Sequence, residues 1–317
     1  MWEIFSGNGL FVFSDPAGAK ACLALDEILN KENIFGERRS VSNKHYSFYQ
    51  QFNSKVEIIE KKDIQQFINQ TNVNWVFTGT SHPDSSGGFE LLFLKNVKSK
   101  TYSFIDHWTN FKLRFTHNND LIYPDIIFVL DDMARELAIA DGLPAEKIAL
   151  FQNPYLFYLR EYAKPTLSRA AFYKKLNIPA NKKIVLYAPD PLSLRQVNFV
   201  NEHTILEELL DLSENNFTLL LKLHPLQPLE RVKKVLNTNS EIKIIRDDDF
   251  LPVDVFKNVD CIIGFYSNYL LEASTVNKNI IRYQVNSDQP DYLNHTLKSV
   301  LVKNKSELEL AIKKCCE

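Results

Sequence analysis

Short apolar runs alternate with longer segments of helical periodicity along nearly the whole chain. The apolar runs are rich in β-branched and aromatic residues and end in turn residues, so they predict β-strands. In the first half, strands are predicted at residues 10–14, 56–60, 75–79, 101–106, 125–130 and 147–151, and helices at 19–31, 62–70, 88–98 and 132–142. In the second half, strands are predicted at residues 183–189, 217–224, 241–246, 260–265 and 279–283, and helices at 200–213, 227–237, 267–276 and 305–315.

Strands that are apolar at almost every position predict parallel sheets that are covered by helices on both faces. Residues 152–168 interrupt the alternation with two prolines and several aromatic residues, and we interpret this stretch as a linker. A chain of 317 residues also exceeds the usual size of one domain. We therefore expect an α/β protein with two Rossmann-like, doubly wound parallel-sheet domains, residues 1–160 and 161–317, that face a cleft.

Composition narrows the class of protein. Hydrophobic residues make up 45% of the chain and charged residues 24%, which is ordinary for a globular protein. The net charge of −2 supplies no basic field, so no nucleic-acid partner is expected. The cysteines form no C-x-x-C pair, which argues against a disulfide framework and against a zinc site.

The N-terminus reads MWEIFSGNGLFVFSDP and lacks the basic start and apolar core of a signal peptide. No apolar run reaches the ~18 residues of a membrane span. We therefore expect a cytoplasmic protein, with peripheral contact at the inner face of the membrane as an option. The aromatic residues of 152–168 either make that contact or fill the junction between the domains.

Ligands of open α/β sheets bind beyond the carboxyl ends of the strands, so the residues after each predicted strand are candidates for a site. In LKLHPLQPLERVKKVL the strand ends at His224, and Pro225 is placed to open a helix. His224 would then lie at a helix N-terminus, where free N–H groups and the helix dipole attract an anion. It is either a phosphate ligand or a turn residue.

The segment DCIIGFYSNYLLEAS carries a second group of candidates. Its strand ends at Gly264, a residue that permits close backbone approach. Ser267 is predicted to cap the next helix, on which Asn268 and Glu272 share a face. These three residues either meet the ribose or phosphates of a nucleotide or belong to a capped surface helix. Asp190 follows another strand of this half and is expected to line the same crevice.

The first half has polar strand ends as well. Thr80, Ser81 and His82 follow the strand at 75–79, and the next helix carries Glu90.

A further strand of the first half, at 101–106, ends in Asp106 and His107. Either side chain is a candidate general base that takes a proton from an attacking hydroxyl. Alternatively, Asp106 orients His107 or caps the helix that we expect to follow. Lys112 and Arg114 are expected on that helix as solvated side chains.

Several sequence motifs for nucleotide binding, hydrolysis and metal binding are absent or incomplete. GNG at residues 7–9 is too short for the dinucleotide fingerprint, and neither a P-loop nor a G-x-S-x-G elbow occurs. RDDDF at residues 246–250 has D-x-D spacing but no neighbouring His or Glu, so no metal site is predicted.

Several segments resemble nucleotide-sugar transferases of the GT-B type. LKLHP is similar to the His-Pro motif of the branch that contains bacterial capsule and teichoic-acid polymerases, sialyl- and Kdo-type transferases and CDP-glycerol glycerophosphotransferases. GFYSNYLLEASTVNKNIIRY is similar to the serine-containing strand-turn-helix of that branch. DIIFVLDDMARELAIADGLPAEKIALFQNP resembles the end of the N-terminal domain in these transferases and in UDP-N-acetylglucosamine 2-epimerases. The resemblance covers roughly residues 75–285.

The resemblance implies an enzyme that moves a sugar from a CMP-, CDP- or UDP-linked donor to a hydroxyl of a glycan or lipid-linked acceptor. A CMP-linked nonulosonate or Kdo donor in bacterial surface glycan synthesis is one such case. No metal or cofactor would be obligatory. The resemblance places His224, with Pro225, and Ser267 with Asn268 on the donor phosphate. Glu272 would reach the ribose or the sugar.

The remaining roles follow from the same resemblance. Gly264 and Asp190 complete the donor side. The N-terminal domain would hold the acceptor beside Thr80, Ser81 and His82, and the catalytic base would be one of Asp106, His107 and Glu90. Two alternatives stay open, namely an epimerase-like enzyme of UDP-sugars and a non-catalytic GT-B-like subunit that binds a partner.

Overall fold

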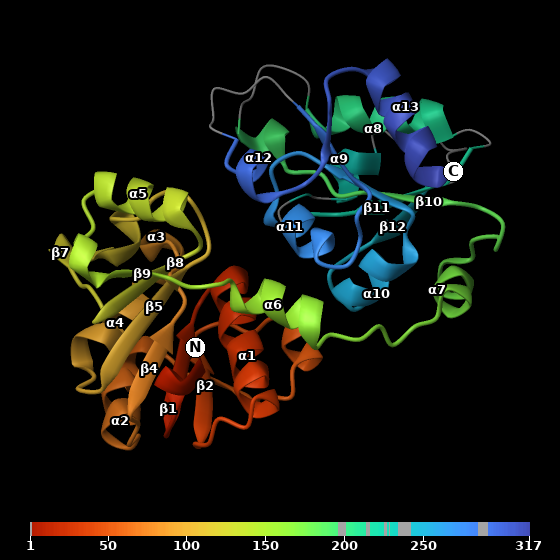
Figure 1. The fold of residues 1–317 in the computed structure, drawn as a ribbon. Coiled ribbons are helices and arrows are strands. Elements are labelled where there is room, and N and C mark those ends of the chain that lie inside the picture. The colour runs from red at the N-terminus through yellow and green to blue at the C-terminus, as the bar shows by residue number, and fades with distance from the viewer. Residues whose placement is uncertain are drawn as a thin grey trace. The chain divides into compact units, whose positions relative to one another are not determined.

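The chain divides into two compact units, Met1–Tyr162 and Ala163–Glu317. The structure is a computed structural model, and it describes residues 2–195, 201–213, 216–224, 227, 229–233, 242–284 and 291–317. Each unit is built on one parallel sheet with helices on both faces (Figure 1). The predicted α/β class with two doubly wound parallel sheets is therefore confirmed.

The first unit has a seven-stranded sheet in the order β3-β2-β1-β4-β5-β8-β9. Every pair of neighbours in it is parallel. Its strands are β1 (Gly9–Phe13), β2 (Arg38–Ser42), β3 (Val56–Ile58), β4 (Trp75–Thr78), β5 (Lys100–Ile105), β8 (Ile126–Val129) and β9 (Ile148–Leu150). The chain runs outward from β1 in one direction and from β4 in the other, so the β1/β4 boundary is the topological switch point.

The helices of the first unit cover both faces of this sheet. They are α1 (Pro16–Lys31), α2 (Ile64–Asn69), α3 (Pro83–Ser86), α4 (Phe89–Asn96), α5 (Asp132–Ala140) and α6 (Pro154–Glu161). On one face, side chains of α2 and α4 pack against the central strands in a single apolar cluster, made of Leu10, Val12, Val41, Ile64, Phe67, Val76, Phe89 and Phe93. On the other face α1 contacts β1 and β4, and α6 packs on α1 (Figure 1).

Short elements complete the first unit. Single 3₁₀ turns lie at Trp2–Phe5, Ser47–Gln51, Lys61–Asp63, Leu113–Phe115 and Ala145–Lys147. A small antiparallel hairpin joins β6 (Thr116–His117) to β7 (Asp120–Leu121). Its two turn residues, Asn118 and Asn119, have φ of 49° and 66°, the left-handed values that a type I′ hairpin turn requires.

The second unit has a six-stranded sheet in the order β12-β11-β10-β13-β14-β15, again with its switch point between two central strands, β10 and β13. Its strands are β10 (Ile184–Tyr187), β11 (Thr218–Lys222), β12 (Lys243–Ile245), β13 (Cys261–Gly264), β14 (Ile280–Tyr283) and β15 (Val300–Val302). The helices are α7 (Arg169–Leu176), α8 (Glu202–Ser213), α9 (Leu229–Lys233), α10 (Pro252–Asn258), α11 (Asn268–Ser274), α12 (Leu293–Thr296) and α13 (Lys305–Cys316), with a 3₁₀ turn at Leu192–Arg195.

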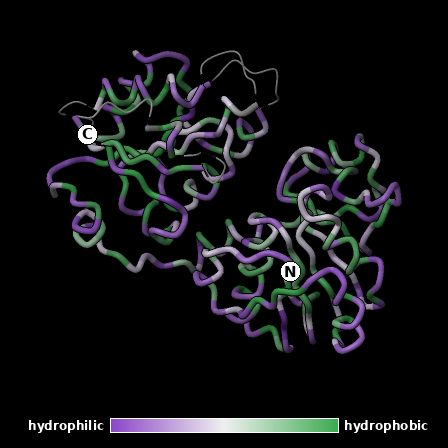
Figure 2. The backbone as a smooth tube through the Cα atoms, turned by 180° about the vertical axis from the view of Figure 1, so that it is seen from behind, coloured by the Kyte–Doolittle hydropathy of each residue, from purple (hydrophilic) through white to green (hydrophobic). Residues whose placement is uncertain are grey.

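The central strands of both sheets are buried at every position, and hydrophobic residues concentrate along them (Figure 2). In the second unit α8 and α13 cover one face of the sheet with buried Leu206, Leu209 and Leu308. Among the described residues, no helix is long and apolar enough to cross a membrane.

The interpretation of residues 152–168 as a linker is wrong for its first half. Pro154 opens α6, and Asn153 caps that helix by accepting hydrogen bonds from the N–H groups of Tyr155 and Leu156. Tyr155 and Leu159 are buried where α6 meets α1. Pro154, one of the two prolines on which the linker interpretation rested, is therefore the first residue of a helix, where its missing N–H has no helical partner to lose.

Two strands of the parallel sheets were not predicted, and neither was the β6–β7 hairpin. β2 (RRSVS) begins with two arginines and has serine on both sides of its one apolar residue, so it lacks an apolar run. β15 is a short edge strand that is exposed at its first two positions.

Backbone contact at the β1/β4 switch point leaves no room for side chains. A Cβ built on Gly79 would lie 2.7 Å from the Cα of Gly18, and one built on Gly18 would lie 3.0 Å from the Cα of Gly79. The start of α1 thus rests directly on the chain that leaves β4. Only glycine permits this approach at Gly79, because the atom that a methyl group would meet is backbone.

We expect Gly79→Ala to destabilise the first unit by about 1–3 kcal/mol, since the added methyl forces backbone to move in a packed region. Urea unfolding measures the effect. Glu136→Ala, on the exposed face of α5, is the matched control and should change the free energy of unfolding by less than about 0.5 kcal/mol. Equal stability of Gly79→Ala and the wild type would contradict the close contact.

Candidate functional site

Three neighbouring strands of the second unit end in polar residues at one edge of the sheet. β11, β10 and β13 are adjacent in that order. His224 follows β11, Asp190 follows β10, and Phe265, Tyr266 and Ser267 follow β13. Because carboxyl ends of parallel strands meet at the same edge, the structure brings these predicted residues to the β10/β13 switch point and its flank.

The ends of β10 and β13 are joined directly. The Asp190 carboxylate is buried and accepts a hydrogen bond of 3.0 Å from the N–H of Tyr266. The two strand ends also touch through backbone, since a Cβ on Gly264 would lie 2.8 Å from the carbonyl oxygen of Ala188. Asp190 and Gly264 therefore shape the turn that leads into α11.

Ser267 begins that helix. Its Oγ accepts a hydrogen bond of 3.3 Å from the N–H of Tyr269, which is the cap that the sequence predicts. A hydroxyl that accepts can still donate its own proton. Asn268 is the first residue of α11, and Glu272 is buried one turn further on the same helix.

His224 does not lie at a helix N-terminus, so that prediction is wrong. The next helix, α9, begins at Leu229, five residues later. Instead the carbonyl of His224 accepts a hydrogen bond of 2.8 Å from the N–H of Gln227 in a turn. Pro225, predicted to open the helix, lies outside the described residues. The partly buried His224 lies two residues after the end of β11, the strand next to β10.

The first unit carries acidic and hydroxyl side chains at the corresponding edge. Thr80 and Ser81 follow β4, and Asp106 follows β5, the next strand in the sheet. Asp15 follows β1, on the other side of β4. The sequence analysis did not identify Asp15, although an Asp-Pro pair after an apolar strand and before a helix is the same signal that drew attention to the other strand ends.

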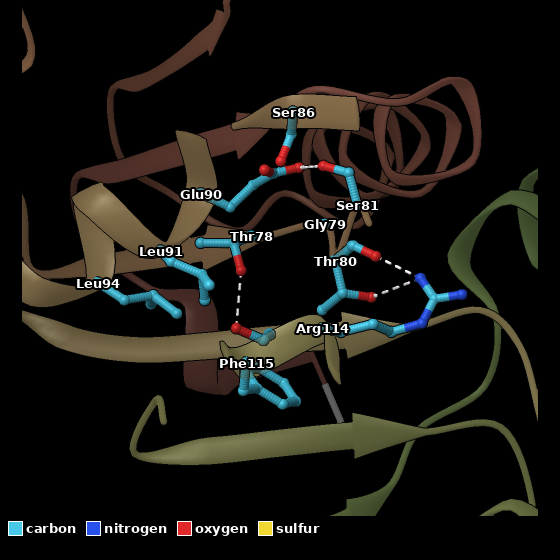
Figure 3. A pocket seen from close by; sticks show the side chains of 11 residues that line it. Thr78, Gly79, Thr80, Ser81, Ser86, Glu90, Leu91, Leu94, Arg114 and Phe115 are labelled. Atoms are coloured by element: carbon cyan, nitrogen blue, oxygen red, sulfur yellow. Dashed lines mark hydrogen bonds between the residues drawn. The ribbon is translucent and has the colours of Figure 1, made fainter. Parts of the chain in front are cut away.

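Glu90 and Ser81 form the inner part of this edge (Figure 3). The hydroxyl of Ser81 donates to the carboxylate of Glu90, and both residues are buried. Together with Thr80 and Ser86 they line a small pocket with room for about one water molecule. Burial raises the pKa of Glu90 to about 7, and the nearby charge of Asp15 adds to the rise.

Asp15 caps α1 by accepting a hydrogen bond of 2.7 Å from the N–H of Gly18. The pKa of Asp15 is raised to about 6, mainly by burial and in addition by the charge of Asp106. Two carboxyl groups with raised pKa values thus lie close together and close to a third, which is the environment in which carboxyl groups exchange protons near neutral pH.

Arg114 balances part of this negative charge. Its guanidinium lies 3.9 Å from the carboxylate of Asp106, and each side chain is only 13% exposed. The same guanidinium donates to the carbonyl of Thr80 (Figure 3). The prediction that Arg114 is a solvated residue of a helix is therefore wrong, because it follows a loop, lies in a 3₁₀ turn and ties β4's end to β5's end.

The two histidines of the first unit that the sequence analysis proposed for the site, His82 and His107, each accept a hydrogen bond from a nearby backbone N–H. The Nδ1 of His107 accepts from the N–H of Trp108 at 3.0 Å, which leaves the proton of the neutral ring on Nε2. The Nδ1 of His82 accepts from the N–H of Asp84 at 3.2 Å and caps α3. Across the described parts of the chain, no group of three or more His, Cys, Asp or Glu side chains is placed to hold a metal ion.

Comparison with known families finds one match. Residues 159–305 match the family described as CDP-Glycerol:Poly(glycerophosphate) glycerophosphotransferase. The matched stretch is just under half of the chain and contains all of the second unit's strands. A search of curated proteins finds no match.

Solved structures resemble the chain over almost its whole length. A putative UDP-N-acetylglucosamine 2-epimerase from Listeria monocytogenes has a TM-score of 0.72 at 15% identity, covering 97% of this chain and 87% of that one. The UDP-GlcNAc 2-epimerase from Methanocaldococcus jannaschii has a TM-score of 0.67 at 16% identity, with 96% and 92% covered. A glycosyltransferase from Rickettsia africae has a TM-score of 0.62 at 16% identity, with 98% and 88% covered. At these identities the likeness establishes the two-domain GT-B-type fold.

The raised pKa of Glu90 predicts a pH dependence of stability. The unfolded carboxyl ionises near its ordinary value of 4.5, and the folded one near 7. Below the lower value both states hold the proton and the stabilisation is complete. As the pH rises between the two values the unfolded chain ionises first, so the free energy of unfolding falls. We expect Glu90→Gln, which cannot ionise, to reduce this fall in urea unfolding between about pH 5 and 7.

Glu57→Gln is the control for this experiment. A hydrogen bond from Arg39 lowers the pKa of Glu57, so that carboxyl is ionised in both states across this range. Its replacement should leave the pH dependence unchanged. A Glu90→Gln chain that follows the wild-type curve would contradict the assignment.

Proposed function

We propose that the chain is a nucleotide-dependent transferase whose second unit binds the donor and whose first unit binds the acceptor. One observation supports the proposal most directly. The matched stretch at residues 159–305 contains His224, Asp190 and Ser267, which the fold gathers on adjacent strand ends at a switch point. Switch points are where doubly wound sheets bind ligands.

The donor side follows from the side chains at that edge. His224 and Ser267 donate hydrogen bonds to the donor phosphates, and Asn268 adds its amide. Glu272 accepts from the ribose or the transferred group. Gly264 keeps the backbone close at this point, since its missing Cβ would meet the carbonyl of Ala188. Donors that are already in place stabilise the charge that develops on the leaving phosphate, so the proposal calls for no obligatory metal.

The acceptor side follows from the carboxyl groups of the first unit. We assign the base to Asp106, because its side chain is partly exposed and held by Arg114, whereas Glu90 is buried and bonded to Ser81. Asp106 takes the proton of the acceptor hydroxyl while that oxygen attacks and the bond to the nucleotide breaks. Thr80, Ser81 and His82 flank the acceptor, and His107 is the alternative base.

The transferred group is proposed to be a sugar on a CMP-, CDP- or UDP-linked donor, as the His-Pro resemblance implies, and the acceptor a surface glycan or its lipid-linked precursor. The matched family's own description names glycerophosphate transfer, so CDP-glycerol belongs in the donor panel beside CMP-linked acid sugars.

A second candidate is an epimerase-like enzyme of UDP-sugars. It is supported by likeness over nearly the whole chain, since the epimerase structures align with 96–97% of it. The glycosyltransferase structure from Rickettsia africae aligns with 98%, so an activity assay has to distinguish the two candidates. Incubation of UDP-N-acetylglucosamine without acceptor separates the two. An epimerised or free sugar favours the epimerase, and unchanged substrate that reacts only when an acceptor is added favours the transferase.

The donor assignment predicts that CMP, CDP or UDP raises the melting temperature of the wild-type chain. His224→Ala and Ser267→Ala each remove a hydrogen bond to a charged group, so we expect nucleotide to bind about ten- to a hundredfold more weakly. Titration calorimetry measures the loss. Lys313→Ala, an exposed residue in the last turn of α13, is the control and should bind as the wild type does. If no nucleotide shifts the melting temperature, the proposed donor site is wrong.

The base assignment predicts a separate effect. Asp106→Asn should lower the transfer rate by about 10²–10⁴-fold, because the amide cannot accept the proton of the acceptor. Nucleotide affinity should be unchanged, since Asp106 lies in the other unit. The exposed Asp132→Asn serves as the matched control for both readouts. Wild-type turnover in Asp106→Asn would remove Asp106 from this role.

A further inference from the structure

One peptide group in the second unit is held by charged side chains from both sides. It is the bond between Phe265 and Tyr266, in the turn that follows β13. Arg282 on β14 donates from Nε to the carbonyl of Phe265 at 3.1 Å. Asp190, after β10, accepts from the N–H of Tyr266 at 3.0 Å. β10 and β14 are the two strands that flank β13, so each neighbour holds one end of the same peptide.

The charges match the peptide. A peptide group is positive at its N–H and negative at its carbonyl, and here the carboxylate faces the first and the guanidinium faces the second. Hydrogen bonds with one charged partner are about twice as strong as neutral ones. This peptide plane therefore has one strongly preferred orientation.

Both charged residues are withdrawn from water. Arg282 is 2% exposed and Asp190 is 8% exposed. The guanidinium of Arg282 also pairs with the carboxylate of Asp291 and lies 5.8 Å from the centre of the Tyr266 ring. Buried ion pairs add little net stability compared with apolar side chains of the same size. A role in orientation accounts for two buried charges at this place better than a role in stability does.

The held peptide lies one residue before Ser267 and is connected to it through Tyr266. Rotation of its plane would turn the backbone at Tyr266 and move the Oγ that caps α11. Gly264, paired with Arg282 in the register of β13 and β14, allows this turn to pass against the end of β10. The position of the Ser267 hydroxyl thus depends on two side chains that are not part of its own turn.

We propose that Asp190 and Arg282 are positioning residues that fix the Phe265–Tyr266 peptide and so aim Ser267 at the oxyanion of a bound nucleotide. This inference rests on the proposed function for the identity of the ligand. It replaces direct nucleotide contact as the role of Asp190, and it assigns a role to Arg282, which the sequence analysis had treated as a strand residue.

The test compares loss and conservative variants in the full chain. Asp190→Ala removes the hydrogen bond to the N–H of Tyr266, and Arg282→Met removes the hydrogen bond to the carbonyl of Phe265. Asp190→Asn keeps an acceptor oxygen for the N–H of Tyr266. With CMP, CDP and UDP as probes, we expect about tenfold weaker binding in each loss variant and wild-type affinity, within about threefold, in Asp190→Asn. Asp291→Asn removes the ion pair of Arg282 without touching the peptide, and it should also bind as the wild type does.

Hydrogen exchange supplies a readout that does not depend on nucleotide. The amide of Tyr266 should exchange faster in Asp190→Ala but not in Asp190→Asn, while the amides of Ile262 and Ile263 within β13 keep their protection. This pattern also shows that the variant is folded.

The outcomes separate the two claims. If the wild-type chain binds none of the nucleotides, the proposed function is wrong. The claim that Ser267 is oriented toward an oxyanion of the nucleotide is then wrong as well. Wild-type binding together with unchanged affinity in folded Asp190→Ala and Arg282→Met overturns the positioning role alone. The positioning role is also wrong if Asp190→Asn binds nucleotide as weakly as Asp190→Ala, because the asparagine retains an acceptor for the N–H of Tyr266 and should restore the affinity. The positioning role is supported if Asp190→Ala and Arg282→Met bind nucleotide more weakly, Asp190→Asn binds as the wild type does, and faster exchange in Asp190→Ala is limited to the amide of Tyr266.

Discussion

Burial on both faces of a parallel sheet confines the chemistry of this protein to the strand ends. The central strands β1, β4, β10 and β13 have no exposed position, so a polar side chain within them would need an internal partner. At the carboxyl ends the chain turns, and the side chains meet both water and free backbone groups. The candidate groups of both units accordingly cluster where the order of strands reverses.

The two edges differ in chemistry although they share a topology. The first unit gathers carboxyl groups. Burial raises the pKa of both Asp15 and Glu90, the charge of Asp106 contributes to the rise at Asp15, and the charge of Asp15 contributes to the rise at Glu90. Arg114 lies beside Asp106. The second unit gathers hydrogen-bond donors and a held peptide around Ser267. An edge rich in carboxyl groups suits proton transfer, and an edge rich in donors suits an anion. The proposed assignment of the acceptor to the first unit and of the donor to the second unit rests on this chemical difference.

Most strands could be predicted because continuous apolar runs mark strands that are buried on both faces. β2 and β15 escaped because the first is half polar and the second is exposed at an edge. A helix does follow His224, as predicted for residues 227–237, but α9 begins at Leu229, so His224 is not at its N-terminus. Asp15 and Arg282 were not predicted as site residues, although their positions in the sequence pointed to a buried polar interaction. An acid after an apolar strand, and an arginine within one, must each find a partner, and only the folded structure shows which.

The position of α6 has a consequence for how this chain can be divided. The family match starts at residue 159, inside that helix, and stops at 305, where α13 begins. Yet α6 is buried against α1, and α13 supplies Leu308, Ala311 and Ile312 to the core of the second unit. A fragment cut at the limits of sequence similarity would keep only the last three residues of α6, a helix of the first unit, and would expose the core of the second unit. The matched stretch thus differs from the compact second unit, and a fragment of that unit is better cut after Tyr162 and kept through α13.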